Sequence, residues 1–486
     1  MIRSATCALY FLFLFLQPSI FANSEPLKTK ESSKAAAATY NELFSSVDDL
    51  AEELGDKYSS LFYPSDEEKA SSLTEQEKAE VLKVISEQLE SLSQVAQQPE
   101  VDFGKAKYFE EAGPAALIPE LGQIRRLILQ TRWHAKETWQ DDSDKALNNL
   151  LNAQAAARHI NQETTLISLL TSIACERICL SNLSELSPKM TPDQRKKVLN
   201  RISQLPRTGS LAEALLAEKQ YMTGWYKHKI LAALSKWEEE HYGTDGFRFP
   251  QDLRLAGVVL MPDLPPRISL HNTRKNHTFW LEKGKEIHGI RLDRVEHVPA
   301  KAWIIHDGIT AVIDLQKETI ENRYVPWEVL YSVFISEDYE YQDRSEADRQ
   351  RQLTELGMTP ESALDHLERV EAFFDEAVTK LDLPIDEFEK WQDEQVTSFP
   401  KDSFGSMMIP SVSKVLEVQK SLQTNYNALE LGFKLQAEES LKQPKDSGFV
   451  LRKNDGGFTL IPEEYIGHEK EYNYSSHFGT PPPKPN

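Results

Sequence analysis

The stretch AARHINQETTLISLLTSIACERICLSNL, Ala156 to Leu183, decides how the middle of this 486-residue chain is interpreted. It holds two pairs of reactive side chains spaced four residues apart, His159 with Glu163 and Cys175 with Cys179. Residues four apart share one face of a helix, so either pair suits a metal ion or a redox site. The alternative is that the stretch forms the inside of a helix bundle.

The angular positions of the side chains favour the bundle. Successive residues of a helix are about 100° apart, which separates a side of small residues from a side of large apolar ones. The small stripe is Ser168, Ser172, Cys175 and Cys179, and the apolar side is Leu166, Leu169, Leu170, Ile173 and Leu180. A helix of this kind is typical of burial between neighbours, and the Cys-x-x-x-Cys spacing is not that of a redox motif. We therefore expect buried thiols.

The pair His159 and Glu163 does not make a metal site by itself. Two ligands are too few for a zinc site, and the chain contains no HExxH motif. The segment Asn161 to Glu163 reads as a helix boundary, where a capping or surface role is expected. We predict no metal ligand and no cofactor here, and the catalytic residues, if any, stay unknown.

Two charged residues, Glu176 and Arg177, interrupt the apolar stretch. An unpaired charge inside a fold is costly, so each should have a partner. We expect Arg125 or Arg126, on the preceding helix, to supply one. The result would be a structural ion pair rather than a catalytic dyad.

Capping signals around the stretch predict a mainly α fold. Thr74 with Glu77, Thr191 with Gln194 and Ser210 with Glu213 each match a capping box before an apolar periodic run. The connections are short, so neighbouring helices should be antiparallel. We predict a helical bundle or helical-hairpin array over residues 73–240 and further helices over 346–445.

The remaining segments have other patterns. Residues 23–72 begin with the spacer KTKESSKAAAATY, expected to be flexible and to lead into short helices. Residues 241–345 predict an irregular mixed α/β segment, with Trp303 to Ile305 as one arm of a hairpin before His306-Asp307-Gly308. Residues 446–486 predict a small β-hairpin around Asn454 to Gly457, followed by a Pro-rich tail.

The first residues, MIRSATCALYFLFLFLQPSIFANSEP, have the features of an export signal. Arg3 precedes an apolar run, and small residues follow it, which predicts a signal peptide over residues 1–22. An uncleaved membrane anchor is the alternative, although Gln17 and Pro18 interrupt the run. We expect no other segment to be apolar enough to span a membrane. The mature body is therefore expected not to span one. The predicted location is periplasmic or secreted.

The charge of the chain excludes one class of partner. The formal net charge is -21, from 55 basic and 76 acidic residues, and the acidic residues are spread along the sequence. Nucleic-acid binding needs a concentrated basic surface. We therefore predict no nucleic-acid partner.

Three segments resemble a family of exported or membrane-anchored helical proteins of planctomycete and verrucomicrobial bacteria. They are the run from Val101 to Ser187 with its Leu166-Ile167-Ser168 motif, the run TPDQRKKVLNRISQLPRTGSLAEALLAEKQ, and SMMIPSVSKVLEVQKSLQTNYNALELGFKLQ. Together they cover about half of the chain. The resemblance implies export and a helical body, and it carries over no catalytic residue.

The densest chemical feature lies in the middle segment. Five of the 12 histidines, His271, His277, His288, His297 and His306, fall within 36 residues. Their spacing is irregular, which favours scattered surface histidines over a metal cluster. We predict an exported cell-envelope protein that is a non-enzymatic interaction or scaffolding module with an envelope protein partner. The alternative is a metal-dependent envelope hydrolase with its site in this His-rich segment.

Overall fold

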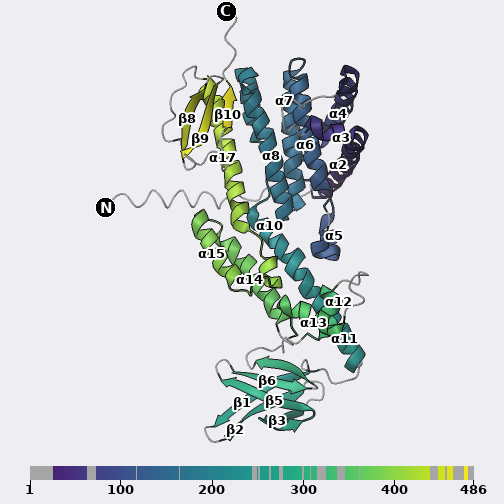
Figure 1. Ribbon diagram of the computed structural model, residues 1–486, viewed down its shortest axis with the longest axis vertical. Coiled ribbons are helices and arrows are strands. Elements are labelled where there is room, and N and C mark those ends of the chain that lie inside the picture. The colour runs from purple at the N-terminus through teal and green to yellow at the C-terminus, as the bar shows by residue number, and fades with distance from the viewer. Residues whose placement is uncertain are drawn as a thin grey trace, which may run out of the picture.

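The chain has a mainly α-helical fold with three small sheets (Figure 1). This computed structural model describes residues 26–62, 73–242, 249, 252–314, 325–335, 345–437, 447–463 and 476–479, apart from short gaps at 117, 164, 262–263, 273–276, 298–299, 307, 361 and 455–456. The segment predicted to be a signal peptide and the Pro-rich end of the tail lie outside the described residues.

The fold opens with helices α2 (Pro26–Leu54), α3 (Asp56–Phe62) and α4 (Glu75–Val95). The expected flexible spacer, residues 28–40, lies within α2, so that prediction is wrong. Four consecutive alanines favour helix there, and Tyr40, Phe44 and Val47 on the same helix are buried. The capping box of Thr74 and Glu77 at the start of α4 is confirmed.

Three long helices form the centre of the bundle: α6 (Glu120–Thr138), α7 (Ser143–Ile160) and α8 (Leu166–Leu186). They lie side by side, with α2 and α4 on the outer side (Figure 1). The short helix α5 (Lys105–Ala112) precedes them. The mainly α-helical fold predicted from the sequence is confirmed.

Helix α8 is the partition between two hydrophobic cores. Leu169, Ile173 and Leu183 belong to the larger core, shared with the C-terminal helices. Cys175 and Cys179 belong to the second core, shared with the N-terminal helices. The small stripe and the apolar side that the sequence separates therefore face two different cores, because neighbours cover both sides of the helix.

This double burial explains the high hydropathy of α8. Leu166–Lys189 is the one described helical segment long and apolar enough to cross a membrane by length and composition, and 61% of its apolar window is buried within the fold. The expectation that no segment beyond the N-terminus is that apolar is therefore wrong. A helix that faces two cores needs apolar residues all round.

Helices α9 (Pro192–Ile202), α10 (Leu211–Glu218) and α11 (Trp225–Tyr242) follow α8. Capping boxes at Thr191 and Ser210 begin α9 and α10 as predicted. One π-helical turn, Lys219–Gly224, joins α10 to α11. The long helix expected after Ser210 is thus present, with an extra residue accommodated in its middle.

Residues 253–314, called the β-module below, form two antiparallel sheets at the end of the molecule away from α2 and α4 (Figure 1). The strands are β1 (Leu253–Met261), β2 (Leu264–Asn272) and β3 (His277–Glu282) in one sheet, and β4 (Glu286–Ile287), β5 (Ile290–His297), β6 (Ala300–His306) and β7 (Ile309–Asp314) in the other. Alternate residues of both sheets share one core. The predicted irregular segment is more regular than expected, and its hairpin arm at Trp303 is confirmed as β6–β7.

The C-terminal part returns to helix and ends in a third sheet. Its helices are α12 (Trp327–Phe334), α13 (Glu346–Glu355), α14 (Ala363–Lys380), α15 (Ile385–Thr397), α16 (Phe404–Met408) and α17 (Val412–Ala437). The predicted hairpin is β8 (Phe449–Asn454) with β9 (Gly457–Pro462), and β10 (Ser476–Gly479) pairs with β9. Helix α17 packs against α8, which brings this part of the chain to the central bundle.

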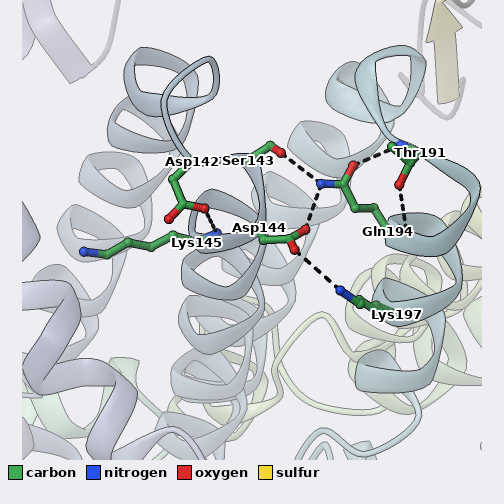
Figure 2. A network of polar contacts seen from close by, with 7 residues as sticks. All are labelled: Asp142, Ser143, Asp144, Lys145, Thr191, Gln194 and Lys197. Carbon is green, nitrogen blue, oxygen red and sulfur yellow. Dashed lines mark hydrogen bonds and ion pairs between the residues drawn. The ribbon is translucent and has the colours of Figure 1, made fainter.

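A polar network joins the starts of α7 and α9 (Figure 2). Gln194 accepts a hydrogen bond from the backbone of Thr191 at 2.9 Å, as its capping box requires. Its side-chain nitrogen donates to Ser143 at 2.9 Å and to Asp144 at 2.8 Å. This donation is the first cause of the lowered pKa of Asp144. A side-chain amide accepts through its oxygen and donates through its nitrogen, so this one side chain both caps α9 and links it to α7.

Replacing Gln194 with glutamate is expected to lower the free energy of unfolding by about 1–2 kcal/mol. Glutamate keeps the cap, but it loses both donated hydrogen bonds and places a second carboxylate beside Asp144. Urea denaturation of the two proteins measures the change. The matched control is Glu213→Gln in the box of Ser210, where the side chain donates no hydrogen bond and accepts from the Ser210 backbone and from the exposed Arg207. An equal loss in both variants would contradict the role of the α7–α9 link.

Candidate functional site

Glu176 of α8 finds its partner on α7. The Arg158 Nε donates to Glu176 Oε2 at 2.8 Å, and the Glu176 side chain is fully buried. The expected pairing with Arg125 or Arg126 is wrong: Arg126 pairs with Asp48 of α2 at a half-exposed position. The direction of α7 explains the difference, because it places Arg158 beside the middle of α8.

Tyr426 of α17 completes a cluster of three residues, named here the Arg–Glu–Tyr cluster. Its hydroxyl donates to Glu176 and accepts from Arg158 Nη2 at 2.8 Å. Gln154, one turn before Arg158 on α7, also donates to this hydroxyl. Arg158 Nη1 donates to the carbonyl oxygen of Pro206 at 3.0 Å. The cluster thus fastens α7, α8, α17 and the loop after α9 to one another.

The electrostatics of the cluster keep its protons in place. Burial opposes the charge of Arg158, but Glu176 and Tyr426 outweigh burial, so the pKa of Arg158 lies above its usual value. Burial, and then Glu176, raises the pKa of Tyr426. Arginine and tyrosine therefore stay protonated, and the charges of Arg158 and Glu176 cancel.

A groove of about 880 Å³ opens above this cluster. Arg158 and Tyr426 form part of its floor. One wall is the face of α17 from Leu416 to Glu430, and the other is the end of α9 with residues 208–212 at the start of α10. The end of α14, at Leu381 and Asp382, closes one side. At 1.5 Å per residue the α17 wall is about 21 Å long, which suits a chain-like ligand.

The lining of the groove combines uncharged polar and apolar side chains. The polar ones are Asn200, Ser203, Thr208, Ser210, Gln419, Gln423, Tyr426 and Asn427, and the apolar ones include Leu199, Ile202, Leu211 and Leu416. The charged residues Lys420, Asp382 and Glu430 are of both signs. Among the described lining residues there is no histidine or cysteine. Amide and hydroxyl groups of this kind can bind a neutral ligand through donated and accepted hydrogen bonds.

Two of the three residues of the Arg–Glu–Tyr cluster lie within one stretch of the sequence, Ala156 to Leu183. Arg158 lies on α7 and Glu176 on α8, 18 residues further along the chain. This separation, across the connection between two helices, matches no spacing rule. Tyr426 lies in the longer segment SMMIPSVSKVLEVQKSLQTNYNALELGFKLQ, for which the sequence predicts no role. Only the packing of α17 on α8 brings the three together.

His159 is a core residue and not half of a metal site. Its Nδ1 lies 2.7 Å from the hydroxyl of Tyr40, and its Nε2 lies 2.8 Å from the carbonyl oxygen of Gln98. Both ring nitrogens are therefore used, and the side chain is fully buried. The expected capping or surface role of His159 is wrong because α2 covers this end of α7. The side chain of Glu163 lies outside the described residues.

Buried histidines should make the stability depend on pH. Burial lowers the pKa of His159 from 6.5 to about 4, and it does the same for His134. Below about pH 6.5 the unfolded chain binds protons that the folded chain refuses, so stability is lost as the pH falls toward 4. We expect each of these histidines to remove about 1–3 kcal/mol of unfolding free energy over this range. Denaturation at a series of pH values measures the loss.

The variant His159→Asn should flatten this pH dependence. The control is His271→Asn, on the surface of the β-module. In this variant the unfolding free energy should change with pH as it does in the wild type. A slope unchanged by His159→Asn would show that another group causes the loss.

Cys175 and Cys179 are free, buried thiols, as expected. Burial raises the pKa of Cys175 to about 12 and also raises that of Cys179. A thiolate is the reactive form of cysteine, so neither thiol is a nucleophile at neutral pH.

The histidines of the β-module lie on different parts of its two sheets. His271 contacts Thr278 at 2.9 Å, and His306 contacts the carbonyl oxygen of Gly289 at 3.1 Å. His277 and His288 lie near each other and beside Phe279. The side chain of His297 is outside the described residues. Within the described part of the chain, no three His, Cys, Asp or Glu side chains gather as metal ligands would.

Comparison of the chain with protein-family models, curated proteins and solved structures finds no match. The sequence resemblance to exported helical proteins therefore stays a prediction. The function must be argued from the residues of this chain.

Proposed function

We propose that the protein is an exported cell-envelope binding module and that its groove receives an uncharged, extended segment of a partner polypeptide. The observation that carries the proposal is the groove itself, with its floor on the Arg–Glu–Tyr cluster. Export rests on the signal-like N-terminus, and the envelope location on the resemblance to exported helical proteins. The envelope partner is a protein in this proposal.

The chemistry of the lining supports a peptide. Side-chain amides such as Gln419, Gln423 and Asn427 donate and accept hydrogen bonds, as the peptide backbone does. Apolar residues between them, such as Leu416 and Ile202, can cover alternate side chains of an extended segment. The mixed charges at the rim favour no strongly charged ligand.

The cluster supports binding rather than catalysis. Glu176 has no exposed surface, and every nitrogen of the Arg158 guanidinium group donates to a partner. General acid or base catalysis needs a group that exchanges a proton with the substrate near neutral pH. Arg158 and Tyr426 hold their protons too tightly for this, so the cluster serves as a rigid floor.

Site-specific photocrosslinking tests the proposal. A photoreactive phenylalanine analogue replaces Gln423, which lies in the groove wall, in cells that export the protein. We expect a crosslinked adduct to an envelope polypeptide whose crosslinked peptide, identified by mass spectrometry, is uncharged over several residues. The adduct should weaken when Asn427→Arg places a charge in the groove.

The control carries the same analogue at Glu389, an exposed residue of α15 outside the groove lining. Equal adducts from both positions would contradict a groove-specific partner. Cleavage of envelope glycan or peptide by the purified protein, abolished by a point substitution, would replace the binding function with a hydrolase function.

A further inference from the structure

The β-module carries a surface that the groove does not use. Trp280 on β3 is 54% exposed, which is unusual for so large an apolar side chain. No helix among the described elements packs extensively on the sheet β1-β2-β3. Figure 1 places this sheet at the end of the molecule far from the central bundle. The indole is therefore available to a ligand.

Strand register places small residues beside Trp280. Trp280 pairs with Ser269 of β2, and Ser269 pairs with Gly257 of β1. Ser269 lies on the face of the sheet opposite to Ile268 and Leu270, which are fully buried in the module core, and Ser269 is itself only 6% exposed. A Cβ built on Gly257 would meet only Ser269, at 3.9 Å. The row, called the trough below, thus has the exposed indole at one end, the covered Ser269 in the middle and a glycine without a side chain at the other end.

Polar rows border the trough on both sides. In one row Arg267 pairs with Glu282 at 2.7 Å, and Lys285 reaches the same carboxylate at 3.2 Å. In the other row His271 contacts Thr278 at 2.9 Å, and Arg254 lies next to His271 in the register. Donor groups outnumber acceptors, so the borders favour a ligand rich in oxygen acceptors.

The charge of this sheet differs from that of the whole chain. The described residues between 253 and 287 include four basic ones, Arg254, Arg267, Lys283 and Lys285, and two acidic ones, Glu282 and Glu286. The chain as a whole has a formal net charge of -21. These described residues therefore carry a small excess of positive charge on an acidic protein, and this excess is complementary to an anionic ligand.

We propose that the trough beside Trp280 binds an acidic polysaccharide. One pyranose ring stacks its apolar face on the indole, while ring hydroxyl and carboxylate oxygens accept hydrogen bonds from Arg267, His271 and Arg254. An aromatic side chain with an apolar face and polar neighbours suits a ligand that has the same two kinds of surface. A nucleic acid also stacks on aromatic rings, so an oligonucleotide is a competing ligand in the test below.

Isothermal titration of the purified protein with a galacturonic-acid hexamer at low salt tests the proposal. We expect binding that weakens as salt is added, because the borders contribute charged contacts. Trp280→Ala should lower the affinity at least tenfold, and Arg267→Gln should lower it and reduce its salt dependence. The control is Trp303→Phe on the other sheet, where Arg294 covers the ring at 4.0 Å; it should bind as the wild type does.

Several outcomes would overturn the proposal. They are no binding of the hexamer, equal binding by Trp280→Ala with an unchanged circular dichroism spectrum, or tighter binding of cellohexaose, of oligothymidylate or of phosphatidylglycerol vesicles than of the acidic hexamer. The groove and the trough lie on different parts of the chain. A negative result for the trough therefore does not affect the crosslinking test of the groove at Gln423.

Discussion

Replacing Arg158 with methionine is expected to lower the free energy of unfolding by about 3–5 kcal/mol. The substitution keeps the apolar stem but removes the guanidinium group from Glu176, whose side chain has no exposed surface. Its Oε1 already lacks a hydrogen-bond partner among the described residues, and Oε2 would keep only the hydroxyl of Tyr426. A buried carboxylate would thus lose its counter-charge. Guanidinium denaturation followed by circular dichroism measures the loss.

Two further variants separate the buried charge from lost packing. Arg126→Met removes a similar side chain from the half-exposed pair with Asp48, and we expect a loss below about 1 kcal/mol. The double variant Arg158→Met with Glu176→Leu removes both charges together. It should recover much of the stability lost by Arg158→Met alone, since no unpaired charge remains. The pairing would be contradicted if the double variant lost as much unfolding free energy as the two single variants lose together.

Truncating Ile173 to alanine is the second change with a large expected effect. The side chain is fully buried in the larger core, on the apolar side of α8. Removing three buried carbon atoms from a packed core leaves a cavity and should cost about 2–5 kcal/mol. Thermal and denaturant unfolding of the purified protein measure this loss of stability.

Ile167→Ala is the matched control on the same helix. Ile167 is 53% exposed, so the same chemical change should alter the stability by less than about 0.5 kcal/mol. A large loss at Ile167 together with a small loss at Ile173 would mean that α8 presents the opposite face to the fold.

Much of the helical architecture was predictable because its signals are local. The capping boxes at Thr74, Thr191 and Ser210 each concern four consecutive residues, and all three begin helices in the structure. The two-sided character of α8 followed from angular spacing alone. The start of α2 was predicted wrongly, because the lysines and serines before its four alanines resemble a linker, whereas Tyr40 and Phe44 further along the helix are buried.

The candidate site was less predictable because it depends on contacts between distant segments. Arg158 and Glu176 are 18 residues apart, and Tyr426 lies 250 residues beyond Glu176. A sequence shows that a buried charge needs a partner but not which helix supplies it, so the choice of Arg125 or Arg126 failed. The trough at Trp280 was hidden for a similar reason, since its rows exist only once the register of β1, β2 and β3 is known.

The account depends most on α8 as the internal partition from which both cores and the groove floor are built. Hydrogen exchange of the folded protein, followed by mass spectrometry, tests this directly. We expect the backbone amides from Leu169 to Leu183 to exchange more slowly than those of the other helices. Their hydrogens should exchange only when the whole protein unfolds. Helix α13, of which only Leu353 is buried, should exchange much faster. Exchange of α8 as fast as that of α13 would contradict the account.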